Sequence, residues 1–357
     1  MITLLTRQDM AKVFTMAEAV QAAKDALALY SAGDTDIPLR ANLPVPAHNG
    51  SALFMYGYAP GASALGVKIV SVYPDNPKRG LPSVPATMVL MDDSTGAVCS
   101  VMDGTYLTRV RTGAVAGAAT DLLARRDSRV FALFGAGGQA EGQLEAVLTV
   151  RDIELAKVCC RTFEKAEAFA RAMSEKFSGR FNTKIVAVHS PEEAIADADV
   201  ITAATTAASP VFDGRLLKPG AHVNGIGSFT YDMVEIDSYT LTHAGKVYAD
   251  TLEGVLGEAG DILQPIHRGE YSKDRITGEL GQLINGAAPG RESDTEITFF
   301  KSVGSAVLDL VTARRIYAKA KEMGIGLKSI CNALQKRPFG HLCGIKKERP
   351  FDMHPES

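Results

Sequence analysis

Apolar residues in the middle of the chain form short continuous runs that alternate with segments of helical spacing. The runs cover residues 130–134, 157–161, 184–188, 199–205, 221–227 and 246–250. Strands that alternate with helices at this pitch are typical of a parallel, doubly wound sheet. The pattern therefore predicts an α/β domain over residues 126–290.

The residues on either side of this region predict a second, α+β domain. A capping box, Thr15 to Glu18, opens a helix through Tyr30. Residues 37–101 contain short apolar runs broken by Pro and Gly, which indicate a mainly antiparallel sheet. A last long helix is expected from residue 294 or 295 to residue 323, because one helical face would carry Phe300, Val303, Val307 and Leu310. We expect residues 1–125 and 291–357 to form this domain together.

The first turn of the middle region carries the sequence Gly135-Ala-Gly137-Gly-Gln-Ala140. Gly135 suits a tight turn, Gly137 lets the backbone approach a pyrophosphate, and the small Ala140 lets the next helix pack closely on the strand. An ordinary Gly-rich turn is the alternative. The strand before the turn and the helix after it favour a Rossmann dinucleotide site, with the pyrophosphate at the helix N-terminus.

The end of the second strand in this region indicates which dinucleotide is bound. Enzymes that prefer an unphosphorylated ribose usually have Asp or Glu there, but this chain has Arg161, with Thr162 beside it and Lys165 one turn on. A planar cation, a hydroxyl and a second charge suit a 2′-phosphate. The sequence therefore predicts NADPH, with NADH as the alternative.

Three cationic side chains outside this region stand out in the sequence, and Arg111 among them suits an anion. Arg111 lies with Thr112 near the start of an Ala- and Gly-rich helix, residues 105–124, whose composition implies close packing; Arg109 fits a surface position better. Arg40 and Lys68 lie in the predicted antiparallel sheet. By period-two alternation Lys68 could simply point outward, and spacing alone leaves this alternative and a buried functional lysine equally open.

Composition excludes several classes of partner. The 357 residues include 38 Lys and Arg against 41 Asp and Glu, for a formal net charge of −3, and no long basic run suggests nucleic acid. No apolar run is long enough for a signal peptide or a membrane span. The five cysteines lack metal-ligand spacing. We expect a cytoplasmic protein with no metal, membrane or nucleic-acid partner.

Over about residues 1–325 the chain resembles the ornithine cyclodeaminase and mu-crystallin family. The motifs that carry the resemblance are Gly135-Ala-Gly-Gly-Gln-Ala140 with Gln143-Leu144, Arg111-Thr-Gly-Ala114, Val223-Asn-Gly-Ile-Gly227 and Phe300-Lys-Ser-Val-Gly304. The resemblance implies a homodimer joined through the sheets of the first domain, with an active site in the cleft between the domains.

The resemblance also implies roles for individual residues. Arg40 and Arg111 would hold the α-carboxylate of an amino or imino acid; Lys68 would contact it too and act as the proton donor, so that Lys68 and Arg111 are the predicted catalytic residues. The predicted cofactor-binding residues are Ser83, Arg111, Thr112, Gly135, Gly137, Gly138, Gln139, Ala140, Arg161, Thr162, Lys165, Thr205, Gly225, Ile226, Gly227 and Ser302.

The chain departs from the family pattern at Phe229. Cyclodeaminases and the related alanine dehydrogenases resemble one another in having an acidic residue at this position, two places after the glycine that Gly227 matches, and Asp232 is not assumed to replace it. A phenyl ring suits the uncharged methylenes of a cyclised imine, so Phe229 is a predicted substrate-binding residue. The tail, residues 326–357, extends beyond the expected end of the family and carries no functional prediction.

Two classes of function fit these observations. The first is an NADPH-dependent reductase of a cyclic imino acid, Δ1-pyrroline-2-carboxylate or Δ1-piperideine-2-carboxylate, with an ornithine cyclodeaminase, an opine-type or an amino-acid dehydrogenase as the alternative within that class. The second is a non-catalytic NADPH-binding protein that sequesters a small carboxylate ligand. Both arginines and Lys68 in one cleft favour the enzyme, because a binding protein needs the charge but no proton donor.

Overall fold

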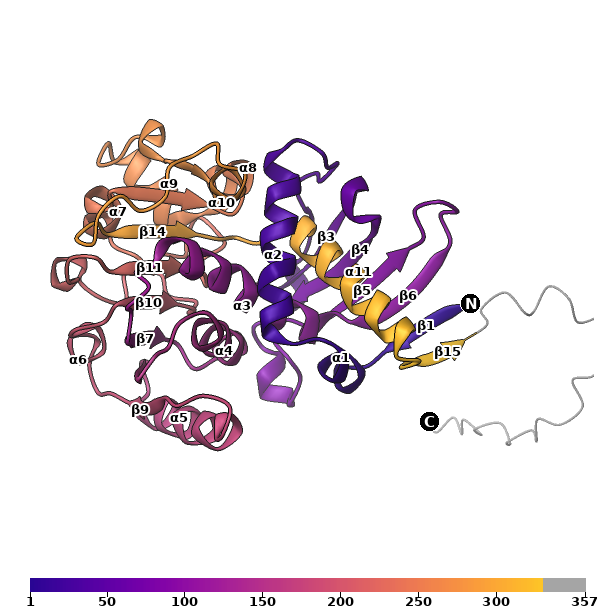
Figure 1. Ribbon diagram of the computed structural model, residues 1–357, viewed down its shortest axis with the longest axis horizontal. Coiled ribbons are helices and arrows are strands. Elements are labelled where there is room, and N and C mark those ends of the chain that lie inside the picture. Colours follow the sequence, from indigo (N-terminus) through magenta and orange to yellow (C-terminus); the bar gives the residue numbers. More distant parts are fainter. Residues whose placement is uncertain (330–357) are drawn as a thin grey trace, which may run out of the picture.

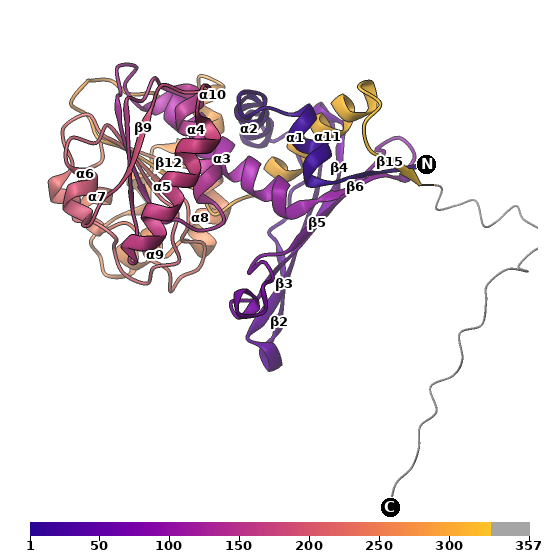
Figure 2. The same ribbon diagram turned by 90° about the horizontal axis from the view of Figure 1, so that it is seen from below.

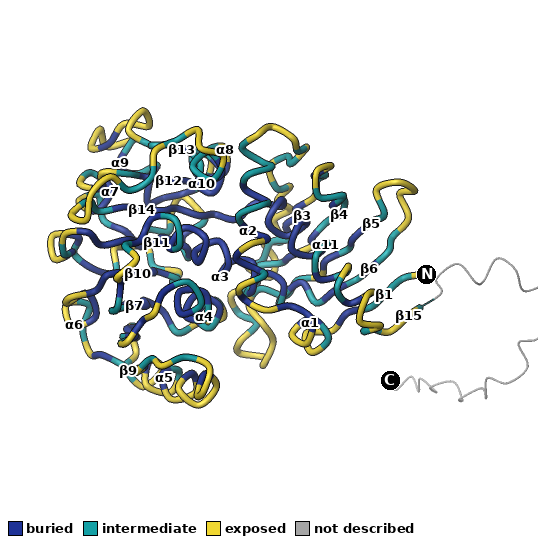
Figure 3. The backbone as a smooth tube through the Cα atoms, viewed as in Figure 1, coloured by how far each residue is buried: buried dark blue, intermediate teal, exposed yellow. Residues whose placement is uncertain are grey.

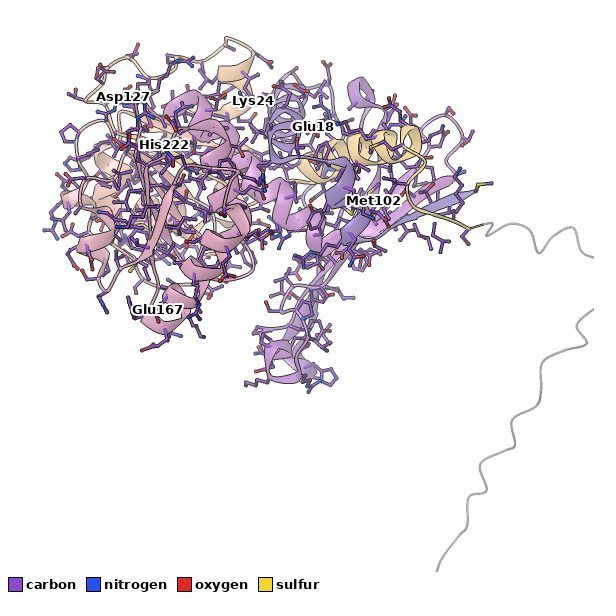
Figure 4. All side chains as sticks on the ribbon, turned by 60° about the horizontal axis from the view of Figure 1, so that its bottom comes forward. Glu18, Lys24, Met102, Asp127, Glu167 and His222 are labelled. Carbon is purple, nitrogen blue, oxygen red and sulfur yellow. The ribbon has the colours of Figure 1, made fainter. Side chains whose placement is uncertain are left out.

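The computed structural model describes residues 1–329, which form two lobes with a sheet in each (Figure 1). Helix α2 (Met16–Ser31) stands between the lobes. In Figure 4, Met102 marks the first lobe and His222 the second. The part of the expected first domain beyond residue 329, with most of the tail, lies outside the described residues. Within residues 1–329, no helix is both long and apolar enough to cross a membrane.

The second lobe contains an eight-stranded sheet whose neighbouring strands are all parallel. The strand order is β13 (Gly278–Glu279), β12 (Lys246–Ala249), β14 (Thr298–Lys301), β11 (His222–Gly225), β10 (Val200–Ala203), β7 (Val130–Phe134), β8 (Leu155–Cys159) and β9 (Lys184–Ala187). The predicted doubly wound parallel sheet is confirmed.

Helices cover both faces of this sheet because its strands are apolar on both sides. Phe131 and Leu133 of β7 pack with α4 (Ala140–Val150) and α5 (Phe163–Phe177), whereas the alternate residues Ala132 and Phe134 belong to the core on the other face. That second face is covered by α6 (Pro191–Ile195), α7 (Ser238–His243), α8 (Leu252–Glu258) and α9 (Gly260–His267).

The first lobe contains a seven-stranded, mainly antiparallel sheet, as its Pro- and Gly-broken runs predict. The order is β15 (Leu327–Ser329), β1 (Ile2–Leu5), β6 (Val98–Asp103), β5 (Ala86–Met91), β4 (Ala64–Val72), β3 (Gly50–Ala59) and β2 (Ala41–Val45). Only β1 and β6 pair in parallel among these described strands. Strands β2 and β3 extend as an arm away from the helices (Figure 2).

Three of the described helices contact this sheet: α1 (Arg7–Val13), α3 (Gly104–Leu123) and α11 (Ala306–Glu322). Helix α2 packs on α3 and α11, and α10 (Leu280–Ile284) of the second lobe packs on α2. Helix α3 is buried along most of its length between the lobes (Figure 3). Ion pairs join α2 to its neighbours: Lys24 pairs with Asp121 of α3 at 2.5 Å, and Glu18 pairs with Lys319 of α11.

The prediction that a helix begins at residue 294 or 295 is wrong for the first part of that segment. Residues 298–301 form β14, an inner strand of the parallel sheet, and the helix begins only at Ala306. Phe299 and Phe300 are fully buried on opposite faces of that sheet. A strand buried on both faces is apolar at every position, so its sequence cannot be distinguished by periodicity from a segment of a buried helix. The parallel sheet therefore extends beyond the expected boundary at residue 290.

Candidate active site

The carboxyl edge of the parallel sheet gathers most of the predicted cofactor residues. Gly135 follows β7, Arg161 and Thr162 follow β8, Thr205 follows β10, and Ser302 follows β14. The strand order reverses between β7 and β10, and ligands of open α/β sheets bind at this edge beside such a reversal. The topology therefore brings together residues that are up to 167 positions apart, counted from Gly135 to Ser302.

The glycine loop after β7 meets the steric requirements of a pyrophosphate site. Gly135 has φ +106°, and a Cβ there would lie 2.8 Å from the Ala204 carbonyl oxygen, so only glycine fits. Gly137 and Gly138 face open space, since a Cβ on either would have no atom within 4 Å. Among residues 1–329, the buried Gln139 Oε1 has no hydrogen-bond partner, which leaves an acceptor at the start of α4 for a ligand.

Helix α3 packs directly on α4 and so fixes the position of Thr112. A Cβ on Gly113 would lie 2.3 Å from the Gly142 carbonyl oxygen, which shows how closely the two backbones approach. Gln143 Nε2 donates a 3.0 Å hydrogen bond to the Thr112 carbonyl oxygen. The Ala- and Gly-rich composition of this helix predicts close packing against another helix or a bound ligand, and the structure shows close packing against helix α4.

The side chains predicted to bind a 2′-phosphate lie on the surface just beyond β8. Arg161, Thr162 and Lys165 are all exposed. Within the described part of the chain, the Arg161 side chain makes no hydrogen bond or ion pair with another residue. A guanidinium beside the glycine loop is therefore available to an anionic ligand.

Lys68 lies in a buried cluster with Asp309 and Arg111, rather than pointing outward from its strand. Lys68 Nζ is 2.6 Å from Asp309 Oδ2, and Arg111 Nε donates to Asp309 Oδ1 at 2.9 Å. Lys68 and Asp309 are at most 1% exposed. Strand β4 and helices α3 and α11 each supply one of the three residues.

Burial strongly lowers the pKa of Lys68, to about 7, because desolvation disfavours the charged amine. The positive charge of Arg111 lowers this pKa further, and the Asp309 carboxylate opposes both effects. The amine can therefore gain or lose a proton near neutral pH, as a group that exchanges protons with a substrate must.

Arg40 connects the first lobe to the second close to the Arg111 side chain. Its Nη2 donates to Glu258 Oε2 at 2.6 Å and to the carbonyl oxygens of Val303 and Gly304 at 2.9 and 3.2 Å. A Cβ on Gly304 would lie 2.7 Å from Arg111 Nη1, and the φ of Gly304 is +84°. Both guanidinium groups therefore meet at Gly304. The structure thus brings together the two arginines that are predicted to bind the substrate carboxylate.

The structure leaves two predicted site residues apart from this cluster. Ser83 is exposed in the loop between β4 and β5, where its carbonyl oxygen accepts a 2.8 Å hydrogen bond from the Tyr73 amide. Phe229 is half-buried after β11, against the core of the second lobe. Their roles in binding stay predictions.

Two acidic residues of the site were missed in the sequence. Asp309 interrupts an otherwise apolar stretch, Val307 to Val311, and that interruption was a usable signal for a buried charge. Glu258 carries no such signal, because the end of a short helix is an ordinary place for Glu. Its importance follows only from its contact with Arg40, 218 positions away in the chain.

Comparison with known proteins identifies the relatives of this fold and site. The model of the ornithine cyclodeaminase/mu-crystallin family matches residues 2–324. The chain belongs to this family. It is 41% identical over 324 residues to a Δ1-pyrroline-2-carboxylate reductase of Bacillus cereus, covering 90% of this chain and 98% of the relative. It is 36% identical over 280 residues to the mouse ketimine reductase mu-crystallin, covering 78% of this chain and 84% of the relative.

Solved structures agree with these sequence relatives. The Δ1-pyrroline-2-carboxylate reductase of Thermococcus litoralis, in complex with NADH and L-proline, superposes with a TM-score of 0.87 at 42% identity, covering 92% of this chain and all of that chain. An archaeal alanine dehydrogenase dimer with bound NAD gives a TM-score of 0.84 at 33% identity, covering 92% and 99%. The protein is therefore a nicotinamide-dependent oxidoreductase that acts on CH–NH or CH–NH2 groups, as predicted.

Proposed function

We propose that this enzyme reduces a cyclic imino acid, Δ1-pyrroline-2-carboxylate or Δ1-piperideine-2-carboxylate, to proline or pipecolate with NADPH. The observation that carries the proposal is the cluster in which Lys68, with a pKa of about 7, lies beside two arginines that meet at Gly304. This arrangement suits a substrate with one carboxylate and one nitrogen that must receive a proton.

The arginines retain free donors for a carboxylate. Within residues 1–329, Arg40 makes its three contacts through Nη2, and Arg111 contacts Asp309 through Nε, so Nη1 of Arg40 and both Nη atoms of Arg111 have no partner among these residues and can bind a ligand. Guanidinium groups bind carboxylates through two parallel hydrogen bonds. The substrate carboxylate would thus be fixed beside the Lys68 amine.

Lys68 would then complete the reduction by supplying a proton to the imine nitrogen. The nicotinamide cofactor, when bound at the carboxyl edge of the parallel sheet, supplies the hydride that the C=N carbon receives. Asp309 holds Lys68 and Arg111 at a fixed separation, since its two oxygens contact one cation each. In the reverse direction, unprotonated Lys68 accepts the proton from the amine.

Arg161 supports NADPH as the preferred cofactor, with NADH as a weaker alternative. Its guanidinium follows β8, the strand that pairs with β7, and Thr162 and Lys165 add a hydroxyl and a second charge. The Thermococcus litoralis relative has NADH bound, so the preference of the present chain needs its own measurement.

Phe229 supports an imine rather than ornithine as the substrate. Ornithine carries a δ-ammonium group, and holding it against a phenyl ring without a carboxylate partner costs several kcal/mol, roughly 2–7 for an unpaired polar group. The ring suits the methylenes of a cyclised substrate. Cyclodeamination is therefore the less favourable reaction at this site.

We also propose a homodimer built on the open face of the first sheet. Helix α11 covers one face, where Met55 and Val70 are buried, while Tyr56 and Ile69 on the other face are 46% and 40% exposed. Large apolar side chains that alternate outward along neighbouring strands suit a second sheet. The archaeal alanine dehydrogenase with a similar fold is a dimer.

A substrate panel tests the proposal. Purified enzyme is mixed with NADPH or NADH and with cyclic imino acids, keto acids with ammonia, or keto acids with methylamine, and cofactor oxidation is followed by absorbance. We expect the fastest oxidation with a cyclic imino acid and NADPH. Absence of oxidation with every compound, together with tight binding of NADPH, would instead support a non-catalytic binding protein.

A further inference from the structure

A buried carboxylate, Glu235, ties together two of the loops at the carboxyl edge of the parallel sheet. Its Oε2 accepts hydrogen bonds from the backbone amides of Gly227 at 2.6 Å and Ser228 at 2.7 Å, and its Oε1 accepts one from the Thr205 amide. Thr205 follows β10, whereas Gly227 and Ser228 follow β11. One side chain therefore spans the ends of two adjacent strands.

The contact between Glu235 and the two loops requires a buried carboxylate and a close approach of the loop backbones. Glu235 is fully buried, and burial raises the pKa of its carboxyl group, although three amide donors and nearby Lys301 favour the charged form. The loops approach so closely that a Cβ on Gly227 would lie 2.1 Å from the Thr205 carbonyl oxygen. The Gly227 amide also makes a longer, 3.3 Å hydrogen bond to the Ala203 carbonyl oxygen, whereas Glu235 accepts from the amides of Ser228 and Thr205 as well and so connects both loops through one side chain.

A chain of buried charges connects Glu235 to a third strand. The backbone amides of Glu235 and Ile236 donate to Asp261 Oδ1 at 2.7 and 3.1 Å, and Asp261 Oδ2 pairs with Lys301 Nζ at 2.8 Å. Lys301 ends β14 and immediately precedes Ser302. The carboxyl ends of β10, β11 and β14 are thus held in one arrangement by two acids and one lysine.

We propose that Glu235 is a positioning residue for the nicotinamide cofactor: it holds the loops after β10 and β11 in the arrangement that binds the dinucleotide, without touching it. The inference rests on the cofactor lying at the carboxyl edge of the sheet and is independent of which imino acid is the substrate. No motif in the sequence singled out Glu235, which follows the Gly227 motif by eight positions.

Asp199 provides a matched control on the opposite edge of the same sheet. It is also buried, and its Oδ2 accepts hydrogen bonds from the backbone amides of Arg129 at 2.7 Å and Val130 at 2.9 Å, where β7 begins. The substitutions Glu235→Gln and Asp199→Asn therefore each place an amide group where a buried carboxylate accepted backbone donors. Only Glu235→Gln does so at the edge where the cofactor is expected.

The test measures the Kd of NADPH by fluorescence, the KM of each substrate, and the thermal midpoint of the full-length wild type and both variants. We expect both variants to have lower thermal midpoints. Only Glu235→Gln should raise the Kd and KM of NADPH, by roughly 10- to 100-fold, the equivalent of one lost charge-assisted hydrogen bond. The KM of the imino acid, taken at saturating NADPH, should change far less. Unchanged NADPH binding in folded Glu235→Gln, or an equal loss in Asp199→Asn, would overturn the proposal.

A second measurement on the wild-type enzyme covers the case in which Glu235→Gln does not fold. Amide hydrogen exchange of the peptide containing Gly227 and Ser228 is compared with and without saturating NADPH. We expect slow exchange without cofactor, because Glu235 accepts both amides, and slower exchange with it. Fast exchange of these amides without NADPH, or no change on its addition, would contradict the proposed role.

Discussion

At the scale of single residues, two cations share the carboxylate of Asp309 inside the protein. Lys68 and Arg111 each contact one of its oxygens, and none of the three side chains is more than 8% exposed. A single carboxylate between two cations leaves one positive charge in excess. An excess of positive charge suits the proposed anionic substrate. Desolvation lowers the pKa of Lys68 most, and the charge of Arg111 lowers it further.

Lys68 should give forward and reverse reactions opposite dependences on pH. Its pKa is lowered to about 7, so the amine is protonated below that pH and neutral above it. We expect kcat/KM for imine reduction to fall, and that for amine oxidation to rise, as the pH increases through about 7. Lys68→Ala should lower kcat by roughly 10²–10⁴. Near-normal kcat in Lys68→Ala would leave Lys68 with a structural role only.

Asp309→Asn should shift these pH dependences to lower pH. The Asp309 carboxylate raises the pKa of Lys68 against desolvation and Arg111, so its removal lets that pKa fall further. The variant should also lose about 3–5 kcal/mol of unfolding free energy, because two buried cations lose their partner. Kinetics at several pH values, recorded below its thermal midpoint, measure the shift. An unchanged pH dependence would show that Asp309 does not act on Lys68.

Arg161→Asp tests the choice of cofactor. The substitution replaces a partner of the 2′-phosphate with a repulsive charge, so the affinity for NADPH should fall by roughly 2–4 kcal/mol while that for NADH is spared. Arg171→Asp makes the same change of charge on the exposed surface of α5 and should alter neither affinity. A wild-type enzyme that already prefers NADH would show that the interpretation of Arg161 is wrong.

The sequence predicted the cations of the site better than their partners. Local signals mark Arg111 and the glycine loop, such as a helix start or a strand before a turn. Arg40 and Lys68 stand out only as polar residues in a strand region, and family resemblance supplied their roles. Asp309 meets Lys68 across 241 positions, and Glu258 meets Arg40 across 218. Contacts over such separations depend on how α8 and α11 pack, which no local pattern specifies.

At the scale of elements, the alternating strands and helices of the second lobe were predictable, but β14 was not. The strands from β7 to β12 follow the chain with a helix or loop between them, whereas β14 returns from residue 298 to lie between β11 and β12. Its four residues are all buried, so it lacks the polar alternation that distinguishes a strand from a helix. Its place in the sheet follows from tertiary packing alone.

The contact of α3 with α4 predicts a large difference between two Gly→Ala substitutions. Gly113→Ala would place a methyl group 2.3 Å from the Gly142 carbonyl oxygen, so α4 and the glycine loop before it must move. We expect a loss of about 1–3 kcal/mol in unfolding free energy and weaker cofactor binding.

Gly257→Ala is the control for this substitution. Gly257 lies in helix α8 with no atom within 4 Å of a Cβ, so alanine should leave stability unchanged or raise it by about 0.5–1 kcal/mol. Urea unfolding and NADPH titration compare the two variants. Equal stability and equal NADPH affinity in both would contradict the close helix contact.

At the scale of the whole molecule, the proposed substrate site depends on both lobes. The first lobe supplies Lys68 and Arg40, and the second supplies Glu258, which contacts Arg40. A single hydrophobic core runs across this boundary, since Ile226 and Tyr248 of the second lobe pack with the buried residues of α2, α3 and α11. The lobes therefore hold the site as one packed unit.

Ile69→Glu tests the proposed dimer. Ile69 is 40% exposed on the open face of the first sheet, so a charge there should convert a wild-type dimer, with twice the 37.9 kDa mass of the chain, into monomers. Leu216→Glu places the same charge on a 49% exposed residue of the second lobe and should leave the dimer intact. Light scattering after gel filtration gives the masses. A monomeric wild type, or a dimeric Ile69→Glu, would place the interface elsewhere or remove it.

The most direct test of the central claim compares two reactions on one preparation of the wild-type enzyme. The first is reduction of Δ1-pyrroline-2-carboxylate or Δ1-piperideine-2-carboxylate with NADPH, and the second is conversion of ornithine to proline and ammonia with catalytic NAD⁺. We predict rapid reduction of a cyclic imine and no ornithine conversion at a comparable rate. This prediction rests on Lys68, Arg40, Arg111 and Phe229. Ornithine turnover as fast as imine reduction, or faster, would contradict the proposed function and identify the enzyme as a cyclodeaminase.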